Sequence, residues 1–132
     1  MPEIASTLIV PLGSKPQLIT LGLDCLRLAG TPPENLLVVH THLARTETAA
    51  ALARLAQDIP QHYPQLNYRT LALAHHGQPL RDVTAPDEVE AAFRALYAEV
   101  RALKLREQRI HLLISGGRRT LTVFGMAVAQ ML

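Results

Sequence analysis

The stretch IHLLISGGRRTLTVFGMA, residues 110–127, decides the fold class. A short apolar run opens it and breaks at a Ser-Gly-Gly turn, residues 115–117. The basic pair Arg118 and Arg119 and a second apolar segment follow. This order is typical of a buried strand, a glycine turn and a buried helix. Glycines and a helix start favour close approach of an anion, so we interpret the turn as a candidate phosphate site, beside the plainer reading that it is only a turn.

Working outward, the N-terminal part of the chain predicts the same order of elements. Residues 6–12 (STLIVPL) are typical of a buried strand, and residues 13–16 (GSKP) predict a turn. Ser14 has an ordinary role there as a helix cap, and Gly30 is a typical helix stop. The helix between them carries apolar residues at helical spacing, namely Leu18, Leu21, Cys25 and Leu28.

The middle of the chain repeats this strand–helix pattern. Residues 36–40 (LLVVH) predict a second strand. The alanine-rich residues 43–59 predict a helix that ends before Pro60, because proline interrupts the hydrogen bonding of a helix. Residues 68–74 (YRTLALA) predict a third strand.

A polar loop from His75 to Thr84 follows, and it raises the question of a metal. Zinc needs several converging ligands, whereas His75 and His76 are adjacent and no cysteine cluster or HExxH spacing accompanies them. We therefore expect no metal site and no other cofactor. Thr84 and Asp87 resemble a capping pair for a long amphipathic helix. Its apolar face comprises Val89, Ala92, Phe93, Leu96, Val100 and Leu103.

Four strands alternating with four helices predict a Rossmann-like α/β fold, a parallel sheet with helices on both faces. In such a sheet the first and fourth strands lie side by side, and ligands bind beyond their carboxyl ends. We therefore expect residues 13–17 to lie next to residues 115–119, with Thr41 and His42 at the rim. No GxGxxG turn and no acidic residue at the end of the second strand are present, which disfavours a dinucleotide.

Composition limits the class of protein. The 132 residues predict a single domain, and 48% hydrophobic with 18% charged residues is typical of a globular chain. A net charge of +2 excludes a general polyanion binder. The single cysteine, Cys25, excludes an internal disulfide, and neither a membrane span nor a signal pattern is evident. We expect a cytoplasmic protein.

Three motifs together resemble those of CARF domains, the CRISPR-associated Rossmann-like sensors. They are residues 12–17 (LGSKPQ) with Thr20 in the helix, residues 77–83 (GQPLRDV), and residues 114–120 (ISGGRRT). The resemblance spans nearly the whole chain. Within the family, the chain resembles the ring-nuclease branch of type III CRISPR systems. It implies a homodimer that recognises cyclic oligoadenylate, an RNA second messenger of antiviral defence with four or six adenylates.

The resemblance also implies a metal-independent ring cleavage and assigns residues to it. In this branch the ligand's own 2′-hydroxyl attacks the adjacent phosphate and leaves a 2′,3′-cyclic phosphate, so the protein is a hydrolase without a metal. The residues implied in cleavage are Ser14, Lys15 and Arg119. Those implied in binding are Gly13, Gln17, Thr41, His42, Ser115, Gly116, Gly117, Arg118 and Thr120.

The chain departs from the branch in three ways. The first turn usually reads Gly-x-Ser-Pro, whereas Ser14 stands one position early and Lys15 occupies its slot. Arg119 stands where a lysine is usual, and arginine hardly gives up a proton. The family also continues past Leu132, so we expect a C-terminal truncation relative to it and an effector domain in the longer protein.

We weigh three functions from the sequence and favour the first. The first is the cyclic oligoadenylate ring nuclease, or a non-cleaving sensor domain of a larger CRISPR effector. The second is an enzyme of the same fold that acts on another nucleotide or phosphorylated small molecule. The third is a structural module whose glycine turns are only turns.

Overall fold

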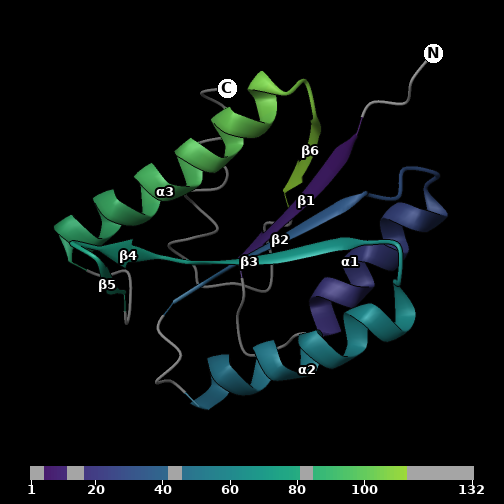
Figure 1. Cartoon of the computed structure of the whole chain (residues 1–132), viewed down its shortest axis with the longest axis horizontal. Coiled ribbons are helices and arrows are strands. Elements are labelled where there is room, and N and C mark those ends of the chain that lie inside the picture. Colours follow the sequence, from purple (N-terminus) through teal and green to yellow (C-terminus); the bar gives the residue numbers. More distant parts are fainter. Residues whose placement is uncertain (1–4, 12–16, 42–45, 81–84, 113–132) are drawn as a thin grey trace.

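Four segments of the chain pair into one parallel sheet in the computed structural model, which describes residues 5–11, 17–41, 46–80 and 85–112 (Figure 1). The strand order is β3-β2-β1-β6. These strands are β1 (Ser6–Pro11), β2 (Asn35–His40), β3 (Asn67–Ala72) and β6 (Arg109–Leu112). The helices are α1 (Gln17–Leu28), α2 (Thr46–His62) and α3 (Pro86–Leu105). The predicted Rossmann-like α/β fold is confirmed.

The first and the last of these strands are neighbours. Strand β1 pairs in parallel with β2 on one side, where Val10 lies opposite Val38, and with β6 on the other, where Ile9 lies opposite Leu112. Because every pairing is parallel, the carboxyl ends of the strands lie along one edge of the sheet. The expectation that strands one and four of the pattern lie side by side is confirmed.

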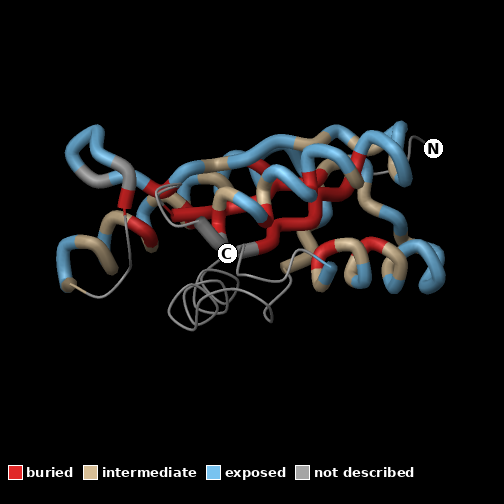
Figure 2. Tube along the Cα trace, turned by 90° about the horizontal axis from the view of Figure 1, so that it is seen from below, coloured by how far each residue is buried: buried red, intermediate tan, exposed pale blue. Residues whose placement is uncertain are grey.

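The core forms on both faces of the sheet because side chains alternate along each strand. On one face α1 and α2 pack against the strands, and on the other face α3 does. Figure 2 shows the buried residues concentrated in the strands between the helical layers. The first core cluster is Leu8, Val10, Ile19, Leu23, Leu36, Val38, Ala51, Leu55 and Ile59. The second is Ile9, Leu37, Val39, Leu73, Leu80, Ala92, Leu96, Val100 and Leu103.

Helix α1 presents a different face to the core than the sequence predicts. Ile19 and Leu23 are its buried residues, whereas Leu21 is 57% exposed and Leu28 is 87% exposed. The helix carries two apolar stripes, and only packing against the sheet selects one of them. The predicted stop is confirmed. Gly30 has φ +82°, its N–H donates to the Arg27 carbonyl, and the Thr31 N–H donates to the Leu26 carbonyl, as in a Schellman motif.

The predicted apolar face of α3 is largely confirmed, but its predicted start is one residue early. Ala92, Leu96, Val100 and Leu103 are buried. The helix is capped at Ala85, whose backbone N–H donates to the Glu88 carboxylate over 3.0 Å. The position three residues after the observed cap is Glu88, not the predicted Asp87, and Thr84 lies outside the described residues.

The predicted third strand and the loop after it are wrong in detail. Strand β3 ends at Ala72, and β4 (Ala74–His75) pairs antiparallel with β5 (Gln78–Pro79) in a small hairpin. His76 and Gly77 make its turn with φ values of +52° and +75°. Positive φ at both central residues is the geometry of a two-residue hairpin turn, and glycine adopts it without strain.

Helix α2 runs past its predicted end. It continues through Pro60 to His62, and the Tyr63 N–H still donates to the Ile59 carbonyl over 2.8 Å. Proline removes one donor near the end of the helix, and the remaining hydrogen bonds of the last turn are made nonetheless. Among the described helices, none is long and apolar enough to cross a membrane.

Candidate functional site

The two predicted glycine turns follow strands that lie side by side. The described part of β1 ends at Pro11, which lies opposite Val39, and the described part of β6 ends at Leu112, which lies opposite Ile9. Neighbouring strands are about 4.8 Å apart, so the two described ends are one strand spacing apart across the sheet and two residues apart along it. The turns themselves lie outside the described residues. The position of the site at these turns and its internal geometry therefore both stay predictions.

Most predicted site residues fall outside the described part of the chain. Gln17 and Thr41 are described: Gln17 is exposed as the first residue of α1, and Thr41 is 4% exposed directly after β2. The others cannot be placed against them. They are Gly13, Ser14, Lys15, His42, Ser115, Gly116, Gly117, Arg118, Arg119 and Thr120.

Three buried polar residues, His40, Thr41 and Thr48, lie at the same edge of the sheet. Only Thr41 was predicted from the sequence as a site residue. His40, the last residue of β2, is 4% exposed, and Thr41 after it is equally buried. Thr48, in the first turn of α2, is 7% exposed. The Nδ1 of His40 lies 2.8 Å from the Thr41 carbonyl oxygen. The signal was present in the sequence, since the apolar run LLVV ends in a histidine.

Two helices begin at this edge on the same face of the sheet. Helix α1 follows β1 and begins at Gln17, and α2 follows β2 and begins at Thr46. Both pack on the face that carries Leu36 and Val38. A helix start presents free N–H groups and partial positive charge, and two of them at one edge favour an anionic ligand.

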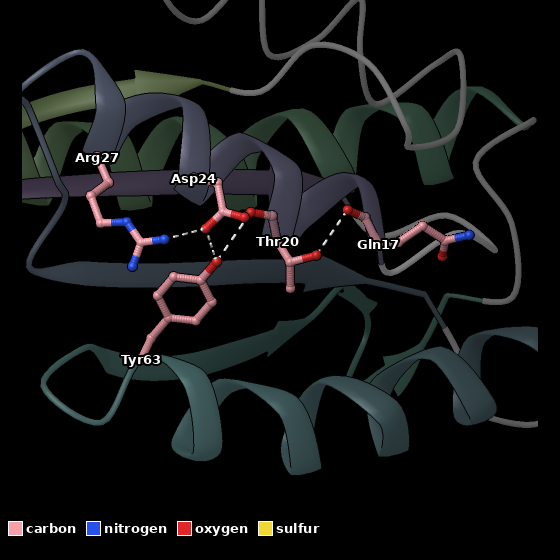
Figure 3. Close-up of polar contacts among 5 residues, drawn as sticks. All are labelled: Gln17, Thr20, Asp24, Arg27 and Tyr63. Carbon is pink, nitrogen blue, oxygen red and sulfur yellow. Dashed lines mark hydrogen bonds and ion pairs between the residues drawn. The ribbon is translucent and has the colours of Figure 1, made fainter.

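A groove of about 690 Å³ runs between α1 and α2 (Figure 3). The Tyr63 hydroxyl donates to the Asp24 carboxylate and lies 3.3 Å from the Thr20 carbonyl oxygen. Asp24 also pairs with Arg27 over 3.1 Å, and the Arg27 guanidinium lies 5.7 Å from the centroid of the Tyr63 ring. The lining residues are Gln17, Thr20, Asp24, Arg27, Arg54, Asp58, His62 and Tyr63.

The groove has the character of a structural contact between the two helices. Burial, followed by the hydrogen bond and the charge of Asp24, raises the pKa of Tyr63 to about 12. Arg54 and Asp58 form a second ion pair over 3.0 Å. Because these charged groups already have partners, we interpret the network around Tyr63 as a clasp that holds α1 against the end of α2.

We expect Tyr63→Phe to lower the free energy of unfolding by about 1 kcal/mol at neutral pH, because one hydrogen bond to Asp24 is lost. The raised pKa of Tyr63 also predicts how this stabilisation changes with pH. Above pH 10 the unfolded wild type gains by ionising Tyr63 while the folded state does not, so this stabilisation is lost between pH 10 and about 12. The measurement is urea unfolding of both proteins across this range. A stability difference that grows with pH would contradict the assignment.

Within residues 5–11, 17–41, 46–80 and 85–112, no three His, Cys, Asp or Glu side chains gather as they would around a metal ion. His76 lies in the hairpin turn beside the start of α3, in a shallow pocket that also includes Asp87, Glu90 and Arg94.

The fold defines the class: an α/β protein with a Rossmann-like parallel sheet. The profile of the family CRISPR-associated protein NE0113 matches residues 15–132 of the chain. The chain therefore belongs to this CRISPR-associated family. No curated protein shows significant sequence similarity to it.

Proposed function

We propose that this CRISPR-associated protein binds cyclic oligoadenylate at the carboxyl edge of its sheet, as a homodimer, and cleaves the ring without a metal. One observation carries the proposal: β1 and β6 are adjacent, so the turns that follow them leave the same edge of the sheet. The membership in a CRISPR-associated family supports a role in CRISPR signalling. The two or more phosphates of a cyclic ligand require several anion-binding groups close together, and this edge supplies them.

Each part of the edge matches a part of the ligand. The starts of α1 and α2 favour phosphate, and Arg118 and Arg119 add fixed positive charge in the turn after β6. A cyclic oligoadenylate has rotational symmetry, and a two-fold dimer presents the same turns twice around such a ring. The 2′-hydroxyls and adenine edges are the groups through which a protein distinguishes this ligand from DNA and from other bases.

The proposed cleavage requires little covalent chemistry from the protein. The ligand's 2′-hydroxyl attacks the adjacent phosphorus in line, and the protein holds that geometry and stabilises the negative charge that develops. We assign Ser14 and Lys15 to the reacting ribose and phosphate and Arg119 to the charge on the phosphate oxygens. Arginine stabilises that charge but is a poor proton donor.

A non-cleaving sensor is the second candidate, and the sequence departures favour it. Ser14 stands one position earlier than in the ring-nuclease branch, and Arg119 replaces a lysine. Both replacements keep hydroxyl and positive charge near the ligand, so they preserve binding. A protein of this kind holds the intact ring and passes the signal to an effector domain.

The deciding experiment is incubation of the protein with cyclic tetra-adenylate and with cyclic hexa-adenylate in EDTA, followed by chromatography of the products. Linear products that end in a 2′,3′-cyclic phosphate are expected from a metal-independent ring nuclease. Intact ring that co-elutes with the protein supports the sensor instead. Neither binding nor cleavage of either ring contradicts the proposal altogether.

We expect Ser14→Ala to slow ring cleavage by roughly tenfold or more and to leave ligand affinity within about twofold, since a hydroxyl at the reacting ribose acts mainly in the transition state. Single-turnover kinetics and equilibrium binding separate the two effects. Thr31→Ala is a matched control, because Thr31 lies between α1 and β2, at the opposite edge of the sheet. A loss of stability with no change of rate would return Ser14 to the role of a helix cap.

A further inference from the structure

We propose that His40 takes the proton from the attacking 2′-hydroxyl during ring cleavage, an inference that rests on the proposed function. It starts from the burial of the side chain. In the described residues, the buried polar set is Ser6, Thr7, His40, Thr41 and Thr48, and His40 is the one ionisable side chain among them. An ionisable group inside an apolar core costs stability, and such groups are concentrated at functional sites.

The position of His40 matches the proposed site. Its backbone is one residue beyond Val39, which lies opposite Pro11, the last residue of β1. Along β2 the side chains of Leu36 and Val38 pack on the face of α1 and α2, so alternation places His40 on that face as well. His40 therefore lies at the carboxyl edge, on the side where both helices begin.

The hydrogen bond of His40 selects its tautomer. A backbone carbonyl only accepts hydrogen bonds, so the contact of 2.8 Å to Thr41 requires the proton on Nδ1. In the neutral ring Nε2 then carries a lone pair. Within the described residues no hydrogen-bond partner occupies Nε2. A backbone carbonyl that holds the proton on one nitrogen makes the other nitrogen the basic one, and this is how proteins orient histidine as a base.

The proposed cleavage requires a group that accepts a proton. As the bond from O2′ to phosphorus forms and the bond from phosphorus to O5′ breaks, the 2′-hydroxyl must release a proton. Arg119 is a poor proton acceptor because it stays charged, and imidazole titrates in the neutral range. Nε2 of His40 takes the proton, O5′ takes one from solvent, and the imidazolium then returns its proton to solvent. No oxidant, reductant or metal is needed for this balance.

His40→Asn tests the inference sharply. The asparagine amide reproduces the Nδ1 donor toward the Thr41 carbonyl but has no titratable nitrogen. We expect cleavage of cyclic tetra-adenylate in EDTA to fall by about 100-fold or more, with affinity for the ring within about twofold of wild type. The wild-type rate should rise with pH on the acid side with a slope of one in log rate, and this dependence should vanish in the variant.

Two other histidines serve as matched controls. His62→Asn changes an exposed residue at the end of α2. His111→Asn changes a residue opposite Leu8, three residues before the end of β1 and therefore roughly 10 Å from that end. Nε2 of His111 is buried without a partner among the described residues, so it is the best rival. Both variants should keep the wild-type rate and pH dependence.

The outcomes separate this inference from the proposed function. Cleavage by His40→Asn at the wild-type rate, a parallel loss of rate and affinity, or a transfer of the effect to His111→Asn overturns the role of His40 and leaves ring cleavage standing. Should the variant fail to fold, a wild-type rate that is flat on the acid side also overturns it. If the wild type binds the ring without cleaving it, the role of His40 as a base is excluded and the sensor function remains. A wild type that does not bind either ring removes both proposals.

Discussion

Replacing both Arg118 and Arg119 with alanine is expected to weaken the binding of cyclic tetra-adenylate by at least roughly 30-fold. Each charge-assisted contact to a phosphate contributes about 1–3 kcal/mol, and about 1.4 kcal/mol changes an equilibrium constant tenfold. Two such contacts together give about 2–6 kcal/mol. Direct binding titration with the intact ring, at a stated salt concentration, measures the effect.

A control with the same change of net charge separates contact from long-range attraction. Arg54 and Arg94 are exposed, and each is paired with an acidic residue one helical turn away. Replacing both with alanine is expected to leave the affinity within about twofold, because exposed ion pairs contribute little and distant charges are screened by salt. Wild-type affinity in the Arg118 and Arg119 variant would remove these residues from the site and leave the glycine turn as only a turn.

Leu37→Ala is expected to lower the free energy of unfolding by about 2–5 kcal/mol, the range for a leucine removed from a closed core. Leu37 is fully buried at 0% exposure, lies in β2 between the two neighbouring strands, and packs in the cluster beneath α3. The cavity left by the side chain adds to the lost transfer free energy, because neighbouring strands cannot collapse into it. Denaturant unfolding followed by circular dichroism measures the change.

Leu28→Ala is the matched control for this substitution. Leu28 is the last residue of α1 and is 87% exposed, so its replacement should change stability by no more than about 0.5 kcal/mol. A loss at Leu28 as large as the loss at Leu37 would show that the outer stripe of α1 is covered in the assembled protein. A loss below about 1 kcal/mol at Leu37 would contradict the observed core.

The sequence by itself determined the succession of strands and helices and their parallel order. Strands that are buried on both faces appear as continuous apolar runs, so 6–12 and 36–40 were recognisable without tertiary information. The run 110–114 was recognisable by its apolar residues, although the described part of β6 is only partly buried. Gly30 was recognisable as a helix stop for a local reason, because a positive φ suits glycine. The adjacency of β1 and β6 followed from the strand order that is typical of doubly wound sheets.

Only the tertiary structure decided which surfaces meet. The two apolar stripes of α1 have the same helical period, so the choice of Ile19 and Leu23 over Leu21 and Leu28 required the sheet against which the helix packs. The clasp of Tyr63 joins residues 39 positions apart, and no local pattern encodes such a contact. The same holds for His40: the sequence shows a histidine after an apolar run, and only burial and the hydrogen bond to Thr41 reveal its tautomer. Local chemistry sets the backbone elements, whereas long-range packing selects which side chains are buried and which of them become functional groups.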